Sequence, residues 1–173
     1  MEKLEVMISE NQLRERLKEL GQNISSDYGE DSNLLLVSIL KGSVVFLADL
    51  MRCIDLPLSI DFMVASSYGN GTESRGNVKI IKDLDVNISD YDILIVEDIL
   101  DSGYTLSKII EILKTRNPRS LRVCALLDKP DRRVTPVQLD YNGFVIEDKF
   151  IVGYGLDYDE KYRNLPYIGV LAR

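Results

Sequence analysis

Three carboxylates follow closely on the apolar run Ile93 to Val96, which is suited to a strand buried on both faces. They are Glu97, Asp98 and Asp101. In open α/β sheets ligands bind beyond the carboxyl ends of the strands, so we expect these acids at a binding site. Because three like charges repel, a positive group is expected among them.

Small residues come next and predict a place for an anion. Ser102 to Thr105 leads into an apolar pattern typical of a helix, with a hydroxyl at either end and Gly103 between them. The free N–H groups and dipole of a helix N-terminus favour a bound anion by roughly 0.3 to 2 kcal/mol. Any one of these features is more often a plain helix start with solvated acids. Their combination favours a ligand with a phosphate at one end and hydroxyls or a metal at the other, as in a ribose 5-phosphate.

A second glycine turn, Lys41 to Ser43, also lies between an apolar run and a predicted helix. By itself this turn is equally consistent with an ordinary strand-to-helix connection. Paired with the first turn, it suggests two anionic groups on one ligand. Phosphoribosyl diphosphate has this form, and its diphosphate would arrive with Mg²⁺.

Histidine is absent from all 173 residues. Nucleophile pairs that need histidine and metals held by histidine are therefore excluded. Carboxylates, Lys and Tyr remain for proton transfer, and carboxylate oxygens remain for a hard metal such as Mg²⁺.

The elements that must position these residues follow from apolar patterns. Ser9 to Gln12 matches a capping box and opens a helix whose apolar period continues to Ile24. Further helices are predicted over Val44 to Ile54, apolar nearly all round, and over Thr105 to Asn117. Strands are predicted at Leu34 to Leu40, Pro57 to Ser67, Val78 to Lys82, Ile93 to Asp98 and Leu121 to Leu127, and shorter ones near Val137 to Leu139, Gly143 to Ile146, Phe150 to Val152 and Ile168 to Leu171.

Strands that lack solvent-facing alternation and are separated by helices predict a mainly parallel sheet covered on both faces. The class is α/β. Without a repeat or linker, residues 1–173 are expected to form a single domain with a less regular C-terminal third. Hydrophobic residues make up 45% of the chain, which is ordinary for a globular protein.

The charge balance argues against a nucleic-acid partner, since 28 acids exceed 21 bases and leave a net charge of −7. The stretch from Lys108 to Arg133 nevertheless holds eight bases and three acids. A regulator that binds RNA or DNA through this stretch is the alternative function. Cys53 and Cys124 are expected to be buried reduced thiols. No signal peptide or membrane span is expected, and the predicted location is cytoplasmic.

Several segments together resemble one family. VEDILDSGYTL resembles the phosphoribosyl diphosphate signature of the type I phosphoribosyltransferases. LKGS at residues 40–43, SSYG at 66–69 and DKFIVGYGLDYDEKYRNLP at 148–166 narrow the resemblance to the hypoxanthine-guanine phosphoribosyltransferases. It covers nearly the whole chain. It implies transfer of a phosphoribosyl group from phosphoribosyl diphosphate to N9 of hypoxanthine or guanine, giving IMP or GMP and diphosphate, with no nucleic-acid or membrane partner.

The resemblance also implies roles for individual residues. Asp101 is implied as the general acid/base at the purine, and Glu97 and Asp98 as holding the ribose diol directly or through Mg²⁺. The implied substrate-binding residues are Lys41, Gly42, Ser67, Tyr68, Glu97, Asp98, Ser102, Gly103, Tyr104, Thr105, Lys129, Phe150, Ile151, Asp157 and Arg163. The implied metal ligands are Glu97, Asp98 and Asp157. Within these sets, Ser102 to Thr105 would hold the 5-phosphate, Lys41, Gly42 and Arg163 the diphosphate, and Lys129, Phe150 and Ile151 the purine.

Each carried-over role has a plainer alternative. Phe150 could be a core aromatic and Lys129 a solvated turn residue. Asp157 and Arg163 could form a surface ion pair that contributes little to stability. Tyr104 occupies a variable position in the phosphate loop, so only its backbone N–H is expected to contribute. In this family the peptide before Lys41 is often cis, and the sequence leaves this open.

The segment Ser66 to Asn77 is predicted to be a flexible lid. It is longer than a typical loop of about 4 to 6 residues, contains three glycines and is expected to close over the site.

The apolar helix predicted over Val44 to Ile54 suggests burial between subunits, in a homodimer or homotetramer.

Overall fold

The computed structural model describes residues 4–67 and 77–172. Tyr68 and most of the predicted lid lie outside these residues. The described part contains three α-helices and one short 3₁₀-helix: α1 (Glu10–Tyr28), α2 (Val44–Met51), α3 (Tyr104–Lys114) and η1 (Pro130–Arg132). Its strands are β1 (Leu4–Ile8), β2 (Leu34–Ile39), β3 (Leu58–Ser67), β4 (Val78–Lys82), β5 (Asp92–Leu100), β6 (Ser120–Asp128), β7 (Tyr141–Val145), β8 (Ile151–Val152) and β9 (Ile168–Leu171).

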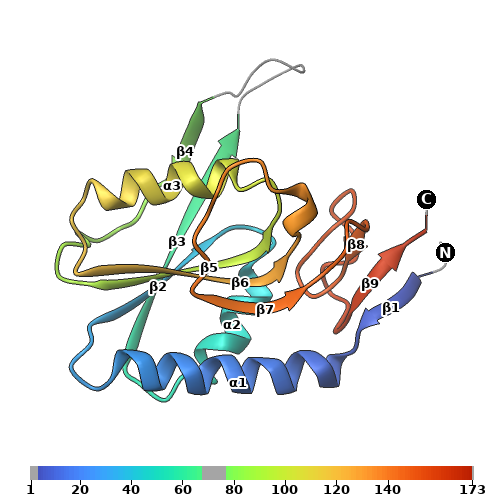
Figure 1. The fold of residues 1–173 in the computed structure, drawn as a ribbon, viewed down its shortest axis with the longest axis horizontal. Helices are drawn as coiled ribbons and strands as arrows, with labels where there is room; N and C mark the ends of the chain where they lie inside the picture. The colour runs from blue at the N-terminus through green and yellow to red at the C-terminus, as the bar shows by residue number, and fades with distance from the viewer. Residues whose placement is uncertain (1–3, 68–76, 173) are drawn as a thin grey trace.

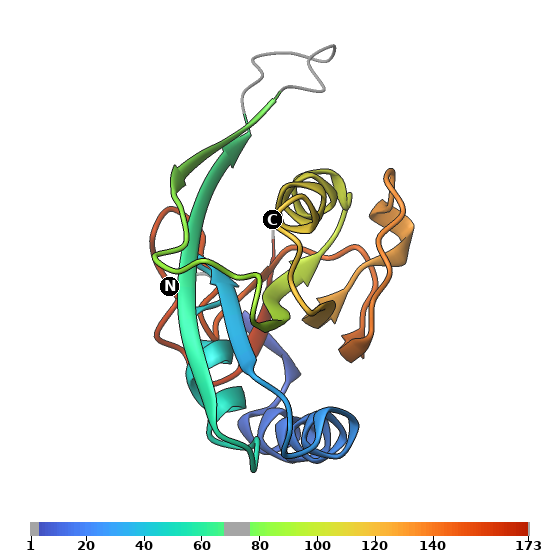
Figure 2. The same ribbon diagram turned by 90° about the vertical axis from the view of Figure 1, so that its left-hand side faces the viewer.

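The central sheet has six strands in the order β4-β3-β2-β5-β6-β7. Every neighbouring pair is parallel except β3 and β4, which form an antiparallel edge. Figures 1 and 2 show α1 and α2 on one face of this sheet and α3 on the other. The predicted α/β class is therefore confirmed. None of the described helices is both long and apolar enough to cross a membrane.

The apolar run of β2 explains why both faces are covered. Leu34 and Leu36 belong to the core cluster that includes α1 and α2, whereas Leu35 and Val37 belong to the cluster that includes α3. Successive side chains of a strand point to opposite faces. A strand with apolar side chains on both of its faces therefore needs helices on both sides, as the sequence predicted.

The first helix forms where its capping box predicts. The Gln12 N–H donates to Ser9 Oγ at 3.2 Å, and the Ser9 N–H donates to Gln12 Oε1 at 2.8 Å. Two N–H groups at the helix start are thus satisfied reciprocally. The helix then buries Leu13, Leu17, Leu20 and Ile24 against the sheet.

Some predicted elements were wrong or misplaced. Residues 137–139 do not form a strand: the segment follows Pro136, its Val137 and Leu139 side chains pack on the α3 core cluster, and Asp140 bonds the Val123 N–H. α2 ends at Met51, three residues before its predicted end, and α3 ends at Lys114 rather than Asn117. Cys53 is only partly buried, whereas Cys124 is buried as expected, and both are free thiols.

A second sheet was not predicted as such. It has three antiparallel strands in the order β1-β9-β8, and β1 had no counterpart among the expected strands. Only one of the five residues of β1 is buried. This sheet pairs the first described strand with the last and lies beside the central sheet, near β7 (Figure 1).

Candidate active site

Glu97 and Asp98 lie inside β5, which continues two residues beyond its predicted end, to Leu100. The Asp98 N–H donates to Glu97 Oε1 at 3.0 Å, and the Ile99 N–H donates to Asp98 Oδ1 at 2.7 Å. Burial raises the pKa of the Glu97 carboxyl well above its ordinary value, and the charges of Asp98 and Asp101 raise it further. The predicted crowding of negative charge is therefore present, and a cation would relieve it.

The turn from β5 into α3 is the segment for which the sequence predicted an anion site. Gly103 has φ 79°, and a Cβ there would overlap the Thr135 carbonyl oxygen. The first turn of α3 contains no acid, so nothing in it offsets the positive end of the helix dipole. A cavity of about 450 Å³ opens beside this turn. It is lined by Ser102, Tyr104, Ser107, Lys108, Glu111, Val134 and Thr135.

Asp101 is exposed on the same turn, and its Oδ1 accepts the Ser102 N–H at 2.6 Å. The Tyr104 N–H lies 3.4 Å from Ser102 Oγ. Of the residues predicted for the phosphate, Ser102 and Tyr104 thus line the cavity, and Gly103 is buried behind them.

The Lys41–Ser43 turn lies against the carboxylates. The Leu40–Lys41 peptide is cis. A Cβ on Gly42 would overlap Asp98 Oδ2, so only glycine lets this backbone approach the acid so closely. Gly155 approaches Gly42 from another direction, since a Cβ on Gly155 would overlap the Gly42 carbonyl oxygen. The Lys41–Ser43 turn, which the sequence linked to the carboxylates only through ligand chemistry, is therefore in contact with Asp98 of β5.

Two buried serines stabilise this turn through hydrogen bonds: Ser43 in the turn itself and Ser38 in β2. Ser43 Oγ donates to the Ile39 carbonyl at 2.5 Å, which leaves Ser38 Oγ to donate to Ser43 Oγ at 2.6 Å. Both side chains are fully buried. Ser38 was not among the predicted residues, although a serine inside the apolar run LLLVSIL was the signal that could have found it.

Lys41 and Arg163, the two cations predicted for the diphosphate, converge on one carboxylate. Glu160 accepts from Arg163 at 3.1 Å and from Lys41 at 3.3 Å, and these bonds lower the pKa of its carboxyl. Arg163 also lies 3.2 Å from Asp157 and donates to the Gly155 carbonyl at 2.8 Å. The structure thus brings Lys41, Arg163 and Asp157 into one cluster.

The residues predicted for the purine lie at the end of β6 and beside β8. Lys129 Nζ donates to the Lys149 carbonyl at 2.7 Å, so its side chain reaches the backbone next to Phe150. The Phe150 ring meets the Tyr158 ring edge-on, with centroids 5.5 Å apart. Ile151 is buried in β8 and pairs with Val170. Ser67 is exposed at the end of β3.

Within residues 4–67 and 77–172, no three His, Cys, Asp or Glu side chains are grouped so that they could hold a metal. Glu97 and Asp98 are adjacent, but Asp157 is engaged by Arg163 and by the Glu160 N–H. Magnesium is commonly bound through one or two carboxylates together with substrate oxygens. The Glu97 and Asp98 donor set fits that mode.

Comparison with known proteins agrees with this geometry. Residues 8–159 match the family model described as "Phosphoribosyl transferase domain". The chain belongs to the phosphoribosyl transferase family. It is 54% identical to the hypoxanthine phosphoribosyltransferase of Buchnera aphidicola over 96% of this chain and 94% of that protein. The predicted resemblance to the hypoxanthine-guanine phosphoribosyltransferases is confirmed.

Two further relatives show the extent of the likeness. The structure matches that of a hypoxanthine phosphoribosyltransferase from Staphylococcus aureus with a TM-score of 0.93 and 52% identity, over 97% of this chain and 91% of the other. The chain is also 52% identical, over 96% of its length, to the bifunctional protein TilS/HprT of Listeria innocua. It spans only 26% of the length of that bifunctional protein.

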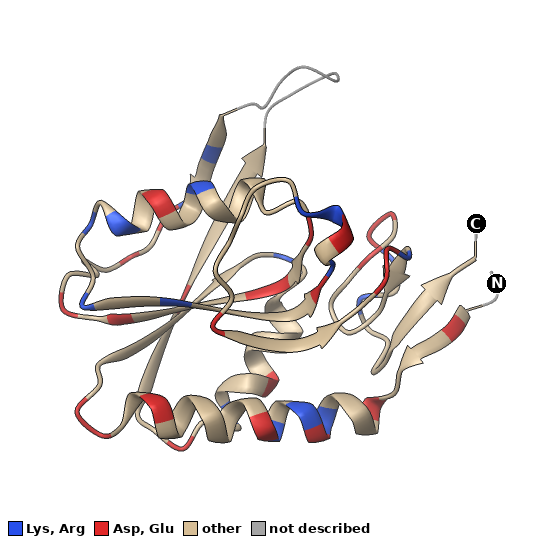
Figure 3. Cartoon of the chain, viewed as in Figure 1, with Lys and Arg blue, Asp and Glu red and all other residues tan. Residues whose placement is uncertain are grey.

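The basic stretch behind the alternative function is largely neutralised in this phosphoribosyl transferase. Six of its eight bases have an acid within 4 Å: Lys108, Arg116, Arg119, Lys129, Arg132 and Arg133. Figure 3 shows acids interspersed with bases along α3 and around η1. An RNA-binding or DNA-binding regulator is therefore not favoured.

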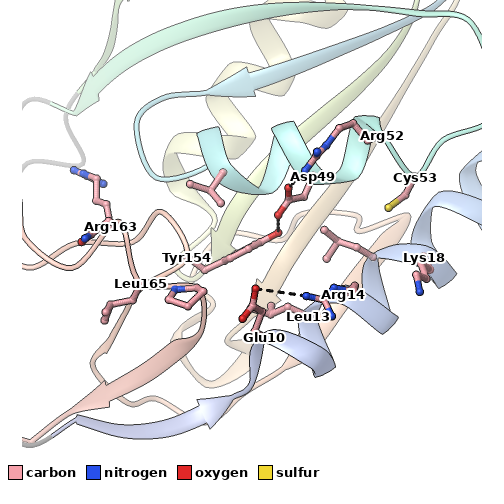
Figure 4. A pocket seen from close by; sticks show the side chains of 14 residues that line it. Glu10, Leu13, Arg14, Lys18, Asp49, Arg52, Cys53, Tyr154, Arg163 and Leu165 are labelled. Carbon is pink, nitrogen blue, oxygen red and sulfur yellow. Dashed lines mark hydrogen bonds and ion pairs between the residues drawn. The ribbon is translucent and has the colours of Figure 1, made fainter.

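A second cavity, of about 460 Å³, was not predicted. It lies between α1, α2 and the C-terminal segment (Figure 4). The Tyr154 hydroxyl donates to Asp49 Oδ2 at 2.5 Å, and Glu10 pairs with Arg14 at 3.5 Å. The charged side chains that line this cavity are thus largely paired with one another, and its lining also includes the apolar Leu13 and Leu17.

Proposed function

We propose that this chain is a hypoxanthine phosphoribosyltransferase that also accepts guanine. It transfers the 5-phosphoribosyl group of phosphoribosyl diphosphate to purine N9, giving IMP or GMP and diphosphate. The observation that carries the proposal is the contact between the Lys41–Ser43 turn and Asp98 of β5, the strand that leads through the Asp101 turn into α3. This contact supports a site in which a diphosphate loop, a diol-binding acid pair and a phosphate cradle would hold one ligand.

The phosphate end of the substrate would bind at the start of α3. Backbone N–H groups of Ser102 to Thr105 and the hydroxyls of Ser102 and Thr105 are the donors there, and the helix dipole adds to them. Glu97 and Asp98 would hold the two ribose hydroxyls. Bound at these two points, the sugar presents its C1 toward Asp101.

Lys41 and Arg163 would hold the diphosphate. Both now bind the Glu160 carboxylate, so an anion can occupy the space between them. In the reaction the bond from C1 to the diphosphate oxygen breaks, and its electrons leave with the diphosphate. Two cations beside that oxygen stabilise the charge that develops there.

The purine would lie near Lys129, Phe150 and Ile151, with the Lys129 ammonium at its exocyclic oxygen. Asp101 accepts the proton that the purine loses as N9 bonds to C1, or shares it with N7. General acid–base help of this kind contributes typically 10² to 10⁴ in rate. Because positive charge builds on the sugar in such transition states, the acids below it also stabilise the reaction centre.

Magnesium is part of the proposal, with Glu97 and Asp98 as its protein ligands and Asp157 as the third predicted one. Bound there with the diphosphate, it would supply charge neutralisation of the leaving group. A homodimer or homotetramer and a cytoplasmic location stay predictions. Val44 and Ala48, exposed on the outward side of α2, support the former.

The test is an ultraviolet assay with phosphoribosyl diphosphate and Mg²⁺, offering hypoxanthine, guanine, xanthine and adenine separately. We expect nucleotide with hypoxanthine and guanine and none with adenine. An Asp101→Asn preparation, purified in parallel, controls for a contaminating enzyme. The absence of nucleotide with every oxopurine would refute the proposed function.

A further inference from the structure

Arg133 lies directly behind the turn that carries Asp101. Its Nε donates to the Asp101 carbonyl at 3.0 Å, and its Nη2 binds the Asp128 carboxylate and lies 3.5 Å from the Leu100 carbonyl. Only 22% of its side chain is exposed. One guanidinium thus joins the end of β5, the start of the Asp101 turn and the end of β6.

The residues after Arg133 bind the same turn. The Val134 and Thr135 N–H groups both donate to the Ser102 carbonyl at 2.9 Å. A Cβ on Gly103 would lie 3.2 Å from Arg133 Cδ, so the arginine stem also packs against the turn. Residues 133–135 therefore hold three successive residues of the turn, from Asp101 to Gly103.

The Asp101 side chain itself is exposed, and Oδ1 accepts from the Ser102 N–H of its own turn. Its direction is consequently set by its backbone, and that backbone is bound by Arg133. Asp128, which receives the other end of the guanidinium, directly precedes Lys129. A shift of the Arg133 side chain would therefore disturb the ends of both β5 and β6.

We propose that Arg133 is a positioning residue for Asp101: it fixes the Asp101 backbone so that the carboxylate faces the purine nitrogen. The inference rests on the proposed function for the role of Asp101, but the bonds that carry it are independent of that role. An arginine suits the task because its planar fork can bind a carbonyl and a carboxylate at once. A lysine would supply only a point charge.

The experiment compares Arg133→Gln with wild type by steady-state kinetics. A misplacement of about 1 Å can cost about 10²-fold in rate, so we expect kcat to fall by about 10-fold to 100-fold. KM for hypoxanthine and for phosphoribosyl diphosphate should change by less than about threefold, since Arg133 does not line the cavity beside the turn and is not among the predicted substrate-binding residues. Arg133→Lys should recover part of the lost kcat because it can still pair with Asp128.

A double-mutant cycle asks whether the effect passes through Asp101. In an Asp101→Asn background, Arg133→Gln should cost less than about twofold further, because coupled positions are not additive. Amide exchange at Ser102 gives a readout without turnover and should quicken by about tenfold in Arg133→Gln, because its bond to Asp101 loosens. Arg116→Gln is the matched control, since it removes a partly buried arginine paired with Asp83, away from the turn.

Each outcome has one meaning for the proposal. Unchanged Ser102 exchange, full additivity in the cycle, or an equal loss of kcat in Arg116→Gln would each overturn the positioning role. If wild-type protein formed no nucleotide, the proposed function would fail, yet the exchange measurement would still decide whether Arg133 orders the turn.

Discussion

Replacing Gly42 with alanine tests the central contact of the site. The added Cβ would lie 3.0 Å from Asp98 Cγ and closer still to Oδ2. To restore ordinary contact the carboxylate must move by at least about 1 Å. The φ of Gly42 is not in the left-handed region, so the backbone itself accepts alanine. The perturbation is therefore confined to the approach of the turn to the acid.

The magnitude follows from what Asp98 would lose. Moving its carboxylate breaks the 2.7 Å bond from the Ile99 N–H, which is worth about 0.5 to 1.5 kcal/mol. Overpacking of this kind costs about 1 to 3 kcal/mol in all. Since an error of about 1 Å costs about 10²-fold in rate, kcat/KM for phosphoribosyl diphosphate should fall by about 10² or more.

The assay combines denaturant unfolding with initial rates at varied phosphoribosyl diphosphate. Gly169→Ala is the control, because a Cβ there meets its nearest neighbour at an ordinary 3.4 Å. Adding Asp98→Ala to Gly42→Ala removes the overlap and should restore much of the stability but none of the rate. A Gly42→Ala enzyme with kcat/KM within about threefold of wild type would contradict this account of the site.

Three other outcomes are expected. Asp101→Asn should bind IMP almost normally by calorimetry while kcat falls by about 10² to 10⁴; an unchanged kcat would remove it from the mechanism. Ser43→Ala should lower the free energy of unfolding in urea by about 1 to 3 kcal/mol because buried Ser38 loses its acceptor, and adding Ser38→Ala should return part of the loss. Burial raises the pKa of Tyr141 to about 12, so the unfolded chain loses this proton from about pH 10 while the folded chain keeps it. Stability should fall as pH rises through that window, and Tyr141→Phe should make the fall shallower in pH-dependent denaturation.

The helices and strands were predictable wherever the residues that stabilise them lie close together in the sequence. The Ser9–Gln12 box is closed by residues three apart, and both of its bonds form. The run LLLVSI, apolar except for Ser38, and the run ILIV show no solvent-facing alternation, so both were predicted as strands covered by helices on both sides. The α/β class followed from these patterns.

Prediction failed where the partner of a segment lies far along the chain. β1 is stabilised by pairing with β9, which lies about 160 residues later in the chain. Only one residue of β1 is buried, so its sequence shows no clear alternation of apolar and polar residues. Residues 137–139 have strand-like side chains, yet their backbone does not join the sheet. In both cases tertiary contacts outweighed the local preference.

The chemistry of the site divides in the same way. By itself the sequence determined which groups are available: acids after an apolar run, glycine turns before helices, and no histidine, because residue type fixes donor, acceptor and charge. Only the tertiary structure decided that Gly42 touches Asp98, that Lys41 and Arg163 share Glu160, and that Arg133 holds the Asp101 turn. The contacts of Gly42 with Asp98 and of Arg133 with the Asp101 turn form because the parallel sheet brings the carboxyl ends of its strands to one edge. Glu160 and Arg163 reach Lys41 from the C-terminal segment between β8 and β9.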